Sequence, residues 1–367
     1  MQLNLTGRPS DVPKIRAGFI GCGSHAFRNV YPTLQFAPVE LVATCDLDAD
    51  RASAFARQFG AERSYTDYRQ MLEKEKLDAV FIVTNYDEHG RPRYGPMAMD
   101  CLRAGKHVWM EKPLCATVEE VDQLSAAAGE LKVMVGYKKM FFPANEKAHQ
   151  LTHAEEFGRI TLASLRYPQQ VPTVDDLKTY LDQKKKVQSA QDFLDHFCHP
   201  ASLLIYLMGM PQTLFYQRTA SGAGVATFGY ADERAATLMF SHGAVHNGGM
   251  EQTVLLSDRR GQVIVDNNLR VTYHRDDRRR GYGASPTFYT AEPNEASAVW
   301  EPEFSLGQLY NKGLFLLGYY GEITEFAGAI LERRPLAKAH LQHARQITQL
   351  FTAFAKGPGK LIELPIS

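Results

Sequence analysis

A glycine-rich turn near the start of the chain constrains the fold more than any other feature of the sequence. The hexapeptide Gly21-Cys22-Gly23-Ser24-His25-Ala26 follows the apolar run KIRAGFIG directly and opens a helical stretch that extends to Phe36. A Gly-x-Gly-x-x-Gly/Ala turn between a strand and a helix is typical of dinucleotide-binding domains with the Rossmann fold. Gly21 permits the tight turn, Gly23 lets a pyrophosphate approach the backbone, and Ala26 allows close helix packing. Ser24 and His25 lie at the helix N-terminus, whose unpaired amides attract an anion; a glycine-rich turn without a ligand is the alternative.

An acidic residue follows at the spacing that this fingerprint requires. Asp46 ends the second predicted strand, VELVATCD, and lies 20 residues after Ala26. A carboxylate there accepts hydrogen bonds from the adenosine ribose hydroxyls and repels a 2′-phosphate. We therefore expect NAD as the cofactor. Arg51 lies close enough along the chain to keep NADP open, and a cap on the next helix is the alternative role for Asp46.

The rest of the amino-terminal part alternates strands with helices, which predicts parallel βαβ units and one doubly wound sheet. After Asp46 we expect a helix over 51–59, the strand DAVFIVT, a helix over 97–103 that Gly105 stops, and the strand HVWME. Thr117 and Glu120 have the spacing of a capping box at the start of another helix. LKVMVGY is the last predicted strand. The sequence therefore predicts an α/β dinucleotide-binding domain over residues 1–136.

From residue 137 to 367 the pattern changes to longer β-rich segments joined by turns. The predicted strands are ITLASLRY, TLFYQRTA, GVATFGYA, RAATLMFSHG, EQTVLLSD and GQVIVDNNLRVTYHR. Helices are expected at about 198–208, 313–333 and 339–356. This pattern indicates an α+β domain with a large, mostly antiparallel sheet. Two domains without a long linker should pack together and leave a cleft between them.

Composition excludes several classes of protein. Lys plus Arg and Asp plus Glu are balanced at 41 each, so the chain lacks the positive field on which nucleic-acid binding relies. The five cysteines form no Cys-x-x-Cys pair, which argues against a disulfide framework and a thiolate zinc site and favours a reducing compartment. We see no signal peptide and no apolar stretch of membrane-spanning length. A cytoplasmic protein without a membrane or nucleic-acid partner is expected.

A second motif lies at the carboxyl end of a predicted parallel strand, the edge where doubly wound sheets bind ligands. Here Trp109-Met110 is followed by Glu111-Lys112-Pro113, and Gly136-Tyr137 ends a later strand. With the glycine-rich turn, these motifs resemble those of the glucose-fructose oxidoreductase, inositol dehydrogenase and rhizopine-catabolism (Gfo/Idh/MocA) family, and the resemblance covers nearly the whole chain. It implies that Lys112 lies between nicotinamide and substrate, where an ammonium stabilises negative charge on a substrate oxygen or acts as acid or base. A surface lysine before a turn proline is the alternative.

Other cofactor contacts follow from the same resemblance. Glu111 precedes the lysine, and Thr84 and His89 match family positions at and beyond the end of the predicted strand DAVFIVT, on the cofactor side. Thr84-Asn85 replaces the usual Thr-Pro, and the segment from His89 to Gly105 is longer than usual. This longer loop should border the nicotinamide half of the cleft and reshape substrate access.

The pentapeptide Asp195-His196-Phe197-Cys198-His199 resembles the family's motif in the second domain, where an aspartate and a histidine four residues later face the substrate. A spacing of four puts both on one side of a helical turn. We expect Pro200 in the first turn of a helix that starts near Cys198, with a kinked helix as the other possibility.

The resemblance makes His199 the general base for a substrate hydroxyl, because an imidazole exchanges protons near neutral pH. Asp195 is expected to orient His199 and to favour its protonated form. Asp192 and His196 are weaker candidates for substrate contact. A metal site and a histidine satisfied within the second domain are the alternatives, although adjacent helical residues diverge and no outside metal ligands are evident.

One departure from the family concerns the substrate pocket. Met140 stands where the family usually has arginine, so Lys138 or Lys139 substitutes for it, or the substrate is less anionic. Tyr137, Tyr167 and Tyr282 are candidates to line a sugar site, with ordinary packing as the alternative.

Together these features predict an NAD(P)-dependent oxidoreductase that transfers hydride between nicotinamide and a secondary carbinol of a sugar, polyol or sugar derivative. Two other functions stay open. The cofactor can be used transiently to cleave glycosides or epimerise sugars, or the fold can serve as a non-catalytic dinucleotide or sugar sensor. Apolar alternation in the second domain's strands predicts a homodimer or homotetramer through that sheet.

Overall fold

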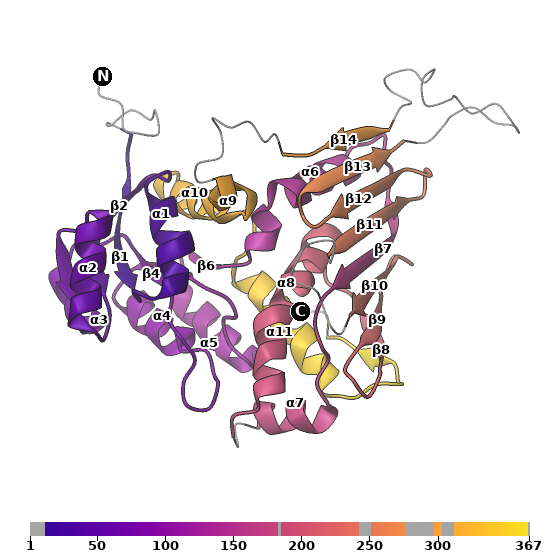
Figure 1. The fold of residues 1–367 in the computed structure, drawn as a ribbon, viewed down its shortest axis with the longest axis horizontal. Helices are drawn as coiled ribbons and strands as arrows, with labels where there is room; N and C mark the ends of the chain where they lie inside the picture. Colours follow the sequence, from indigo (N-terminus) through magenta and orange to yellow (C-terminus); the bar gives the residue numbers. More distant parts are fainter. Residues whose placement is uncertain (1–11, 183–184, 242–250, 276–296, 303–311, 366–367) are drawn as a thin grey trace, which may run out of the picture.

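The computed structural model describes residues 12–182, 185–241, 251–275, 297–302 and 312–365. These residues form two separate β-sheets with helices packed between and around them (Figure 1). Tyr282, a candidate sugar contact, lies outside the described residues. In the part of the chain that the structure describes, no helix combines the length and apolar character needed to cross a membrane.

The amino-terminal sheet has six strands, all parallel, in the order β3-β2-β1-β4-β5-β6. The strands are β1 (Ile15–Ile20), β2 (Val39–Cys45), β3 (Arg63–Tyr65), β4 (Ala79–Ile82), β5 (His107–Met110) and β6 (Val133–Val135). The predicted doubly wound sheet is confirmed. Because the chain winds outward in opposite directions from β1 and β4, the carboxyl ends of these two strands flank the crevice where such sheets bind ligands.

The helices of this part largely follow the predicted pattern. They are the π-helix η1 (Ala26–Val30), α1 (Tyr31–Leu34), α2 (Ala49–Phe59), α3 (Tyr68–Lys74), α4 (Tyr94–Arg103) and α5 (Val118–Ala128). The capping box at α5 is confirmed, since the Glu120 carboxylate accepts the Thr117 amide at 3.0 Å. The strand β3 and the helix α3 were not predicted from the sequence. The strand β3 is only three residues long and largely exposed, so it carries no apolar run that could reveal it.

The second sheet has nine strands in the order β14-β13-β12-β11-β7-β10-β9-β8-β15. They are β7 (Ile160–Tyr167), β8 (Thr213–Arg218), β9 (Gly224–Gly229), β10 (Ala235–Phe240), β11 (Gln252–Ser257), β12 (Gln262–Asp266), β13 (Arg270–His274), β14 (Ala298–Trp300) and β15 (Ile362–Glu363). Only the β7–β10 pair among them is parallel, so the predicted mostly antiparallel sheet is confirmed.

The helices that accompany this sheet are η2 (Lys138–Phe141), α6 (Pro143–Thr152), α7 (Val174–Leu181), α8 (Gln188–Met208), α9 (Lys312–Leu316), α10 (Tyr319–Leu331) and α11 (Leu341–Phe354). Helices α6 and α7 were not predicted from the sequence. One helix is predicted over 313–333, but Gly318, with φ +77°, separates α9 from α10. Helices α8 and α11 lie between the two sheets (Figure 1).

The expectation that a helix starts near Cys198 is wrong. Helix α8 begins at Gln188, so Pro200 lies in its interior rather than in its first turn. A proline inside a helix removes one backbone hydrogen bond. Packing compensates for this loss, because Phe193 and Phe197 stack at 5.0 Å between ring centroids and both pack edge-on against Phe354 of α11.

The carboxyl-terminal helices return to the first sheet. Phe326 of α10 packs against Phe81 of β4 with ring centroids 5.7 Å apart, and the Val135 amide donates to the Ala339 carbonyl at 2.9 Å. Helix α11 contacts both α5 and α8. The division at residues 136 and 137 therefore stays a proposal about sequence segments, since residues after 312 pack on both sheets.

Candidate active site

The glycine-rich turn lies at the carboxyl end of β1, beside the end of β4. Gly21 has φ +105°, and a Cβ atom added there would come within 1.8 Å of the Val83 carbonyl oxygen. Only glycine avoids both the strain and the collision. A Cβ added at Gly23 would meet no atom within 4 Å, so its backbone borders open space that a pyrophosphate can approach.

A cavity of about 520 Å³ opens at this switch point. Its walls come from the glycine-rich turn, α2, the segment after β4, α4, the end of β5, and α8. The lining residues are Gly23, Ser24, His25, Ala26, Arg51, Val83, Thr84, Asn85, Tyr86, Tyr94, Glu111, Lys112 and Asp195. The structure thus brings together predicted residues from both parts of the chain. Val83, Tyr86 and Tyr94 were missed.

The carboxylate of Asp46 lies at the edge of the glycine-rich turn. Its Oδ2 atom accepts the Cys22 amide at 2.8 Å, and its Oδ1 atom pairs with the Arg51 guanidinium at 3.1 Å. The cap of α2 is Asp48, which accepts the amides of Asp50 and Arg51. The capping role considered for Asp46 therefore belongs to Asp48, and the Asp46 carboxylate is left beside the turn.

His25 connects the glycine-rich turn to the end of β5. Its Nε2 atom lies 2.9 Å from the Glu111 carboxylate and 3.3 Å from the Tyr319 hydroxyl of α10. Burial would raise the pKa of Glu111, but the His25 hydrogen bond and the charges of His25, Lys112 and Lys138 hold that pKa below its usual value. Glu111 therefore stays ionised in the cavity wall.

Lys112 and Asp195 form an ion pair that joins β5 to α8. The Lys112 Nζ atom donates to the Asp195 Oδ1 atom at 2.9 Å and to the Asp195 carbonyl at 3.1 Å. Burial works to lower the pKa of Lys112, but the nearby Cys198, Asp195 and Glu111 raise it overall. The ammonium is therefore charged at neutral pH. Two of its three N–H groups bind Asp195, which leaves one for another acceptor.

His199 lies one turn after Asp195 on α8 and is buried, with 9% of its surface exposed. Burial and the positive charges of Lys112, Lys138 and Lys139 lower the pKa of His199 well below its usual value, so the imidazole is neutral at neutral pH. Its Nδ1 atom has no hydrogen-bond partner within the described ranges.

The expected pairing of Asp195 with His199 is not what the structure shows. The Asp195 carboxylate instead contacts Lys112, the Tyr86 hydroxyl at 2.5 Å and His196 at 3.7 Å. The expectation that Asp195 favours a protonated His199 is also wrong. Positive charges and burial act on the imidazole more strongly than this carboxylate does.

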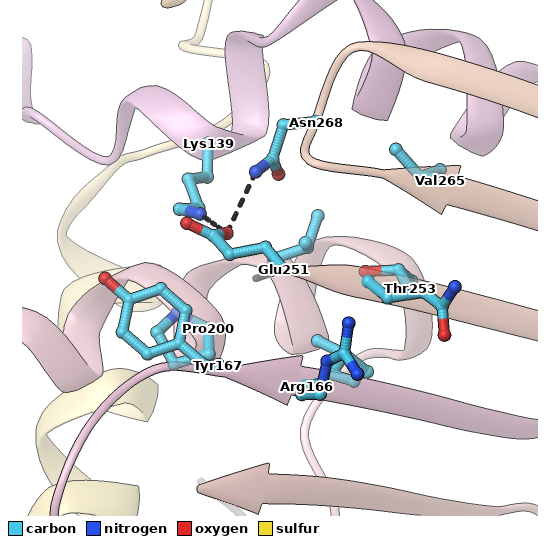
Figure 2. Close-up of a pocket in the computed structure, with 11 residues that line it drawn as sticks. Lys139, Arg166, Tyr167, Pro200, Glu251, Thr253, Val265 and Asn268 are labelled. Atoms are coloured by element: carbon cyan, nitrogen blue, oxygen red, sulfur yellow. Dashed lines mark hydrogen bonds and ion pairs between the residues drawn. The ribbon is translucent and has the colours of Figure 1, made fainter. Parts of the chain in front are cut away.

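Lys139 lies outside the switch-point cavity, in a small polar cluster to which Pro200 of α8 also contributes (Figure 2). Its ammonium forms an ion pair with Glu251, whose carboxylate also accepts the Asn268 amide at 2.9 Å. Figure 2 shows Lys139 and Asn268 converging on the Glu251 carboxylate above the Tyr167 ring, whose centroid lies 5.0 Å from the ammonium. The Lys139 charge is therefore compensated within the protein.

This cluster yields a prediction about stability. The Lys139 side chain is 5% exposed, so Glu251→Leu leaves a buried ammonium without its partner. Removing one member of a buried pair costs about 3 kcal/mol or more, which should lower Tm by several degrees in calorimetry. The double variant Lys139→Met/Glu251→Leu should recover most of that loss. A single variant as stable as the wild type would contradict the pairing.

Other predicted residues lie elsewhere. His89 is exposed beside Glu88, and Asp192 is exposed on α8 and accepts the Gln188 side chain at 2.7 Å. His196 is also exposed. Tyr137 is 2% exposed at the start of η2.

Lys138, the other candidate to replace the family's arginine, donates to the Tyr319 hydroxyl at 3.2 Å, and burial lowers its pKa. Lys138 is not among the described residues that line the switch-point cavity.

The cavity residues that were not predicted from the sequence share one feature, their place after strand β4. Val83 and Tyr86 follow β4, one of the two strands that flank the switch point, and Tyr94 begins the next helix. Side chains just after a switch-point strand face the ligand crevice. Throughout the described ranges, no cluster of three or more His, Cys, Asp or Glu side chains is arranged to hold a metal ion.

Comparison with known proteins supports the dinucleotide-binding fold. Residues 15–139 match a family described as an oxidoreductase family with an NAD-binding Rossmann fold. The uncharacterized oxidoreductase YrbE of Bacillus subtilis is 25% identical over 334 residues, which cover 86% of this chain and 86% of that protein. The scyllo-inositol 2-dehydrogenase (NAD(+)) of the same organism is 27% identical over 237 residues, or 63% of this chain and 65% of that enzyme. A dehydrogenase structure from Chromobacterium violaceum has a TM-score of 0.76 at 21% identity and covers 93% of this chain and 94% of that one.

The fold and its switch-point cavity define an NAD-binding oxidoreductase. More specifically, residues 15–139 match the model of the glucose-fructose oxidoreductase, inositol dehydrogenase and rhizopine-catabolism family.

Proposed function

We propose that this protein transfers hydride between NAD and a secondary carbinol of a sugar, polyol or sugar derivative. The observation that carries the proposal is the Lys112–Asp195 pair in the wall of a cavity that the glycine-rich turn also lines. This arrangement places an ammonium from the first sheet and a carboxylate from α8 beside one space. The similarity to a scyllo-inositol dehydrogenase supports a polyol-like substrate.

The cofactor fits the residues present. The open backbone at Gly23 offers room for a pyrophosphate, and the Asp46 carboxylate beside Cys22 offers acceptors for ribose hydroxyls. Ser24, His25, Ala26, Thr84 and Glu111 line the same cavity. We propose these residues and Gly21 as the NAD site; His89, exposed outside it, has no supporting contact. When bound, NAD supplies the hydride acceptor at nicotinamide C4.

Lys112 and Asp195 act together on the substrate oxygen. The remaining N–H of Lys112 donates to that oxygen and stabilises the negative charge that develops as its proton leaves. Asp195 takes the other two N–H groups and so aims the ammonium. His199 is the proposed base, since its imidazole is neutral and its Nδ1 atom has no hydrogen-bond partner among the described residues. Tyr137, Asp192 and His196 stay proposals as substrate contacts, whereas the Glu251 pair argues against Lys139.

The choice between NAD and NADP yields a prediction. We expect the Asp46 carboxylate to lie beside the 2′ position of the adenosine ribose. It pairs with the Arg51 guanidinium at 3.1 Å, and Asp48 contacts the same guanidinium at 3.4 Å. Asp46→Ser should weaken NAD binding about 10-fold, because it removes an acceptor for the ribose hydroxyls, and should strengthen NADP binding by releasing Arg51. Tryptophan-fluorescence titration with both cofactors measures the two constants. Asp50→Ser, which removes another acidic side chain from the first turn of α2, is the control; an unchanged preference in Asp46→Ser would contradict the assignment.

A substrate panel tests the function itself. The purified protein is mixed with NAD or NADP and myo-inositol, scyllo-inositol, aldoses, sugar acids or aryl glycosides, and the absorbance of the reduced nicotinamide is followed. Net NADH formation with a sugar or polyol is the expected result. Glycoside cleavage or epimerisation without net NADH would favour transient use of the cofactor, and NAD binding without turnover of any compound would favour a sensor.

We also propose a homodimer or homotetramer in the cytoplasm. The outer face of the second sheet exposes Phe215, Val225 and Met239 on adjacent strands, and a second copy could cover this apolar face. All five cysteines are free, as expected in a reducing compartment. Light scattering after size exclusion measures the assembly.

A further inference from the structure

Tyr86 belongs to the segment after β4 in which this sequence departs from its family. Tyr86 lines the switch-point cavity, and its hydroxyl donates to the Asp195 Oδ1 atom at 2.5 Å. The same oxygen accepts the Lys112 ammonium at 2.9 Å. Tyr86 follows β4 of the first sheet and Asp195 lies on α8, so this hydrogen bond links the first sheet to α8.

The loop that carries Tyr86 is held in place at several points. Tyr86 and Pro92 form a β-bridge, and the Asp87 side chain accepts the amides of His89 at 2.9 Å and Arg91 at 2.7 Å. These contacts close residues 86–92 into a compact turn. The position of the Tyr86 ring is therefore set by the backbone around it.

A second set of contacts ties this turn to α7. Arg91, 8% exposed, donates to the carbonyls of Tyr180 and Leu181 and lies 4.6 Å from the centroid of the Tyr180 ring. The Tyr180 hydroxyl donates back to the Gly90 carbonyl at 2.8 Å. Carbonyls at the end of a helix attract a cation, so this guanidinium fastens the loop to the second part of the chain.

In the contact between Tyr86 and Asp195, a neutral hydroxyl donates a hydrogen bond to an ionised carboxylate. Burial and the Asp195 charge raise the pKa of Tyr86, so its hydroxyl stays protonated. Burial would raise the pKa of Asp195, but the Lys112 charge and the hydrogen bonds from Tyr86 and Lys112 hold it below its usual value. The titratable groups that interact electrostatically with this carboxylate are Lys112, Tyr86, Tyr94, Tyr167, Tyr180, His196 and Cys198.

We propose that Tyr86 is a positioning residue that acts through Asp195. Its hydroxyl fixes the Asp195 oxygen that aims the Lys112 ammonium at the substrate. This proposal rests on the proposed oxidoreductase site. It gives the 86–92 loop, where the sequence departs from the family, a specific role. The loop holds Asp195 and Lys112 in the relative positions that the proposed reaction requires.

The test compares Tyr86→Phe with a matched control. Tyr216→Phe also removes a buried tyrosine hydroxyl, which donates to the Phe354 carbonyl at 2.6 Å in the second sheet, away from the cavity. In protein labelled with ¹³C at the aspartate carboxyl, Asp195→Asn identifies the Asp195 resonance. Its titration should move to higher pH in Tyr86→Phe and stay unchanged in Tyr216→Phe, because only the first loses a donor to the ionised form.

Turnover with NAD and the best substrate of the panel gives an independent readout. Tyr86→Phe should lower kcat/KM roughly 10-fold to 100-fold, while Tyr86→Phe/Asp195→Asn should be no slower than Asp195→Asn alone. An unchanged Asp195 titration, or a full further loss in the double variant, would overturn the positioning role. If the titration moves but Asp195→Asn and Lys112→Met turn over normally, the proposed catalytic site fails and the contact between Tyr86 and Asp195 stands.

Discussion

Lys112→Met is expected to lower kcat/KM by about 100-fold or more, with little change in NAD affinity. The substitution keeps an apolar chain of similar length but removes the only N–H group that the Asp195 contacts leave for a substrate oxygen. Negative charge on that oxygen then develops without a nearby cation. Steady-state rates of NADH formation and fluorescence titration with NAD measure the two quantities separately.

The control for this variant is another partly buried lysine of the same domain. Lys106 donates to the Leu77 carbonyl at 2.9 Å and does not line the cavity as described. Lys106→Met should therefore leave kcat/KM close to that of the wild type. Turnover in Lys112→Met within a few-fold of the wild type would show that another group stabilises the substrate oxygen.

Gly21→Ala is expected to destabilise the protein by about 4 kcal/mol or more and to abolish NAD binding. The added methyl would lie within 1.8 Å of the Val83 carbonyl oxygen, at a φ of +105° that alanine rarely adopts. The turn can relieve this overlap only by moving away from β4, which distorts the crevice. Calorimetry and NAD titration both follow the change.

Gly60→Ala measures the cost of backbone strain at a glycine where an added methyl group meets no steric overlap. Gly60 ends α2 with φ +80°, and a Cβ atom there would meet nothing within 4 Å. This variant should lose only about 1–2 kcal/mol, the cost of left-handed backbone, and should bind NAD normally. Equal losses in the two variants would mean that the Val83 contact does not limit the turn.

Several features of the site could be predicted because they depend on neighbours in the sequence. The glycine-rich turn, the spacing to Asp46 and the place of Lys112 at a strand end all follow from local pattern and from the geometry of parallel sheets. The cavity joins most of these residues. The start of α8 was missed because the sequence rule for proline describes an isolated helix, whereas packing against α11 holds Pro200 in the interior.

The partners of the charged groups could not be predicted in the same way. Nothing in the spacing of Asp195 and His199 indicates that the carboxylate turns to Lys112 and Tyr86, which are separated from it by 83 and 109 positions. The sequence offers Lys139 as a substrate contact. In the fold, Glu251, which is 112 positions away along the chain, pairs with its ammonium. Such contacts depend on how the two sheets and α8 meet.

By itself, the sequence determined the class of the fold and the edge of the sheet where chemistry takes place, because hydrophobic period, turn residues and strand ends are local properties. Only the tertiary structure decided which charges meet and which histidine atom is left unpartnered. The reason is physical: burial and the distance between charged groups set ionisation and pairing, and both arise only when segments far apart in the chain pack together.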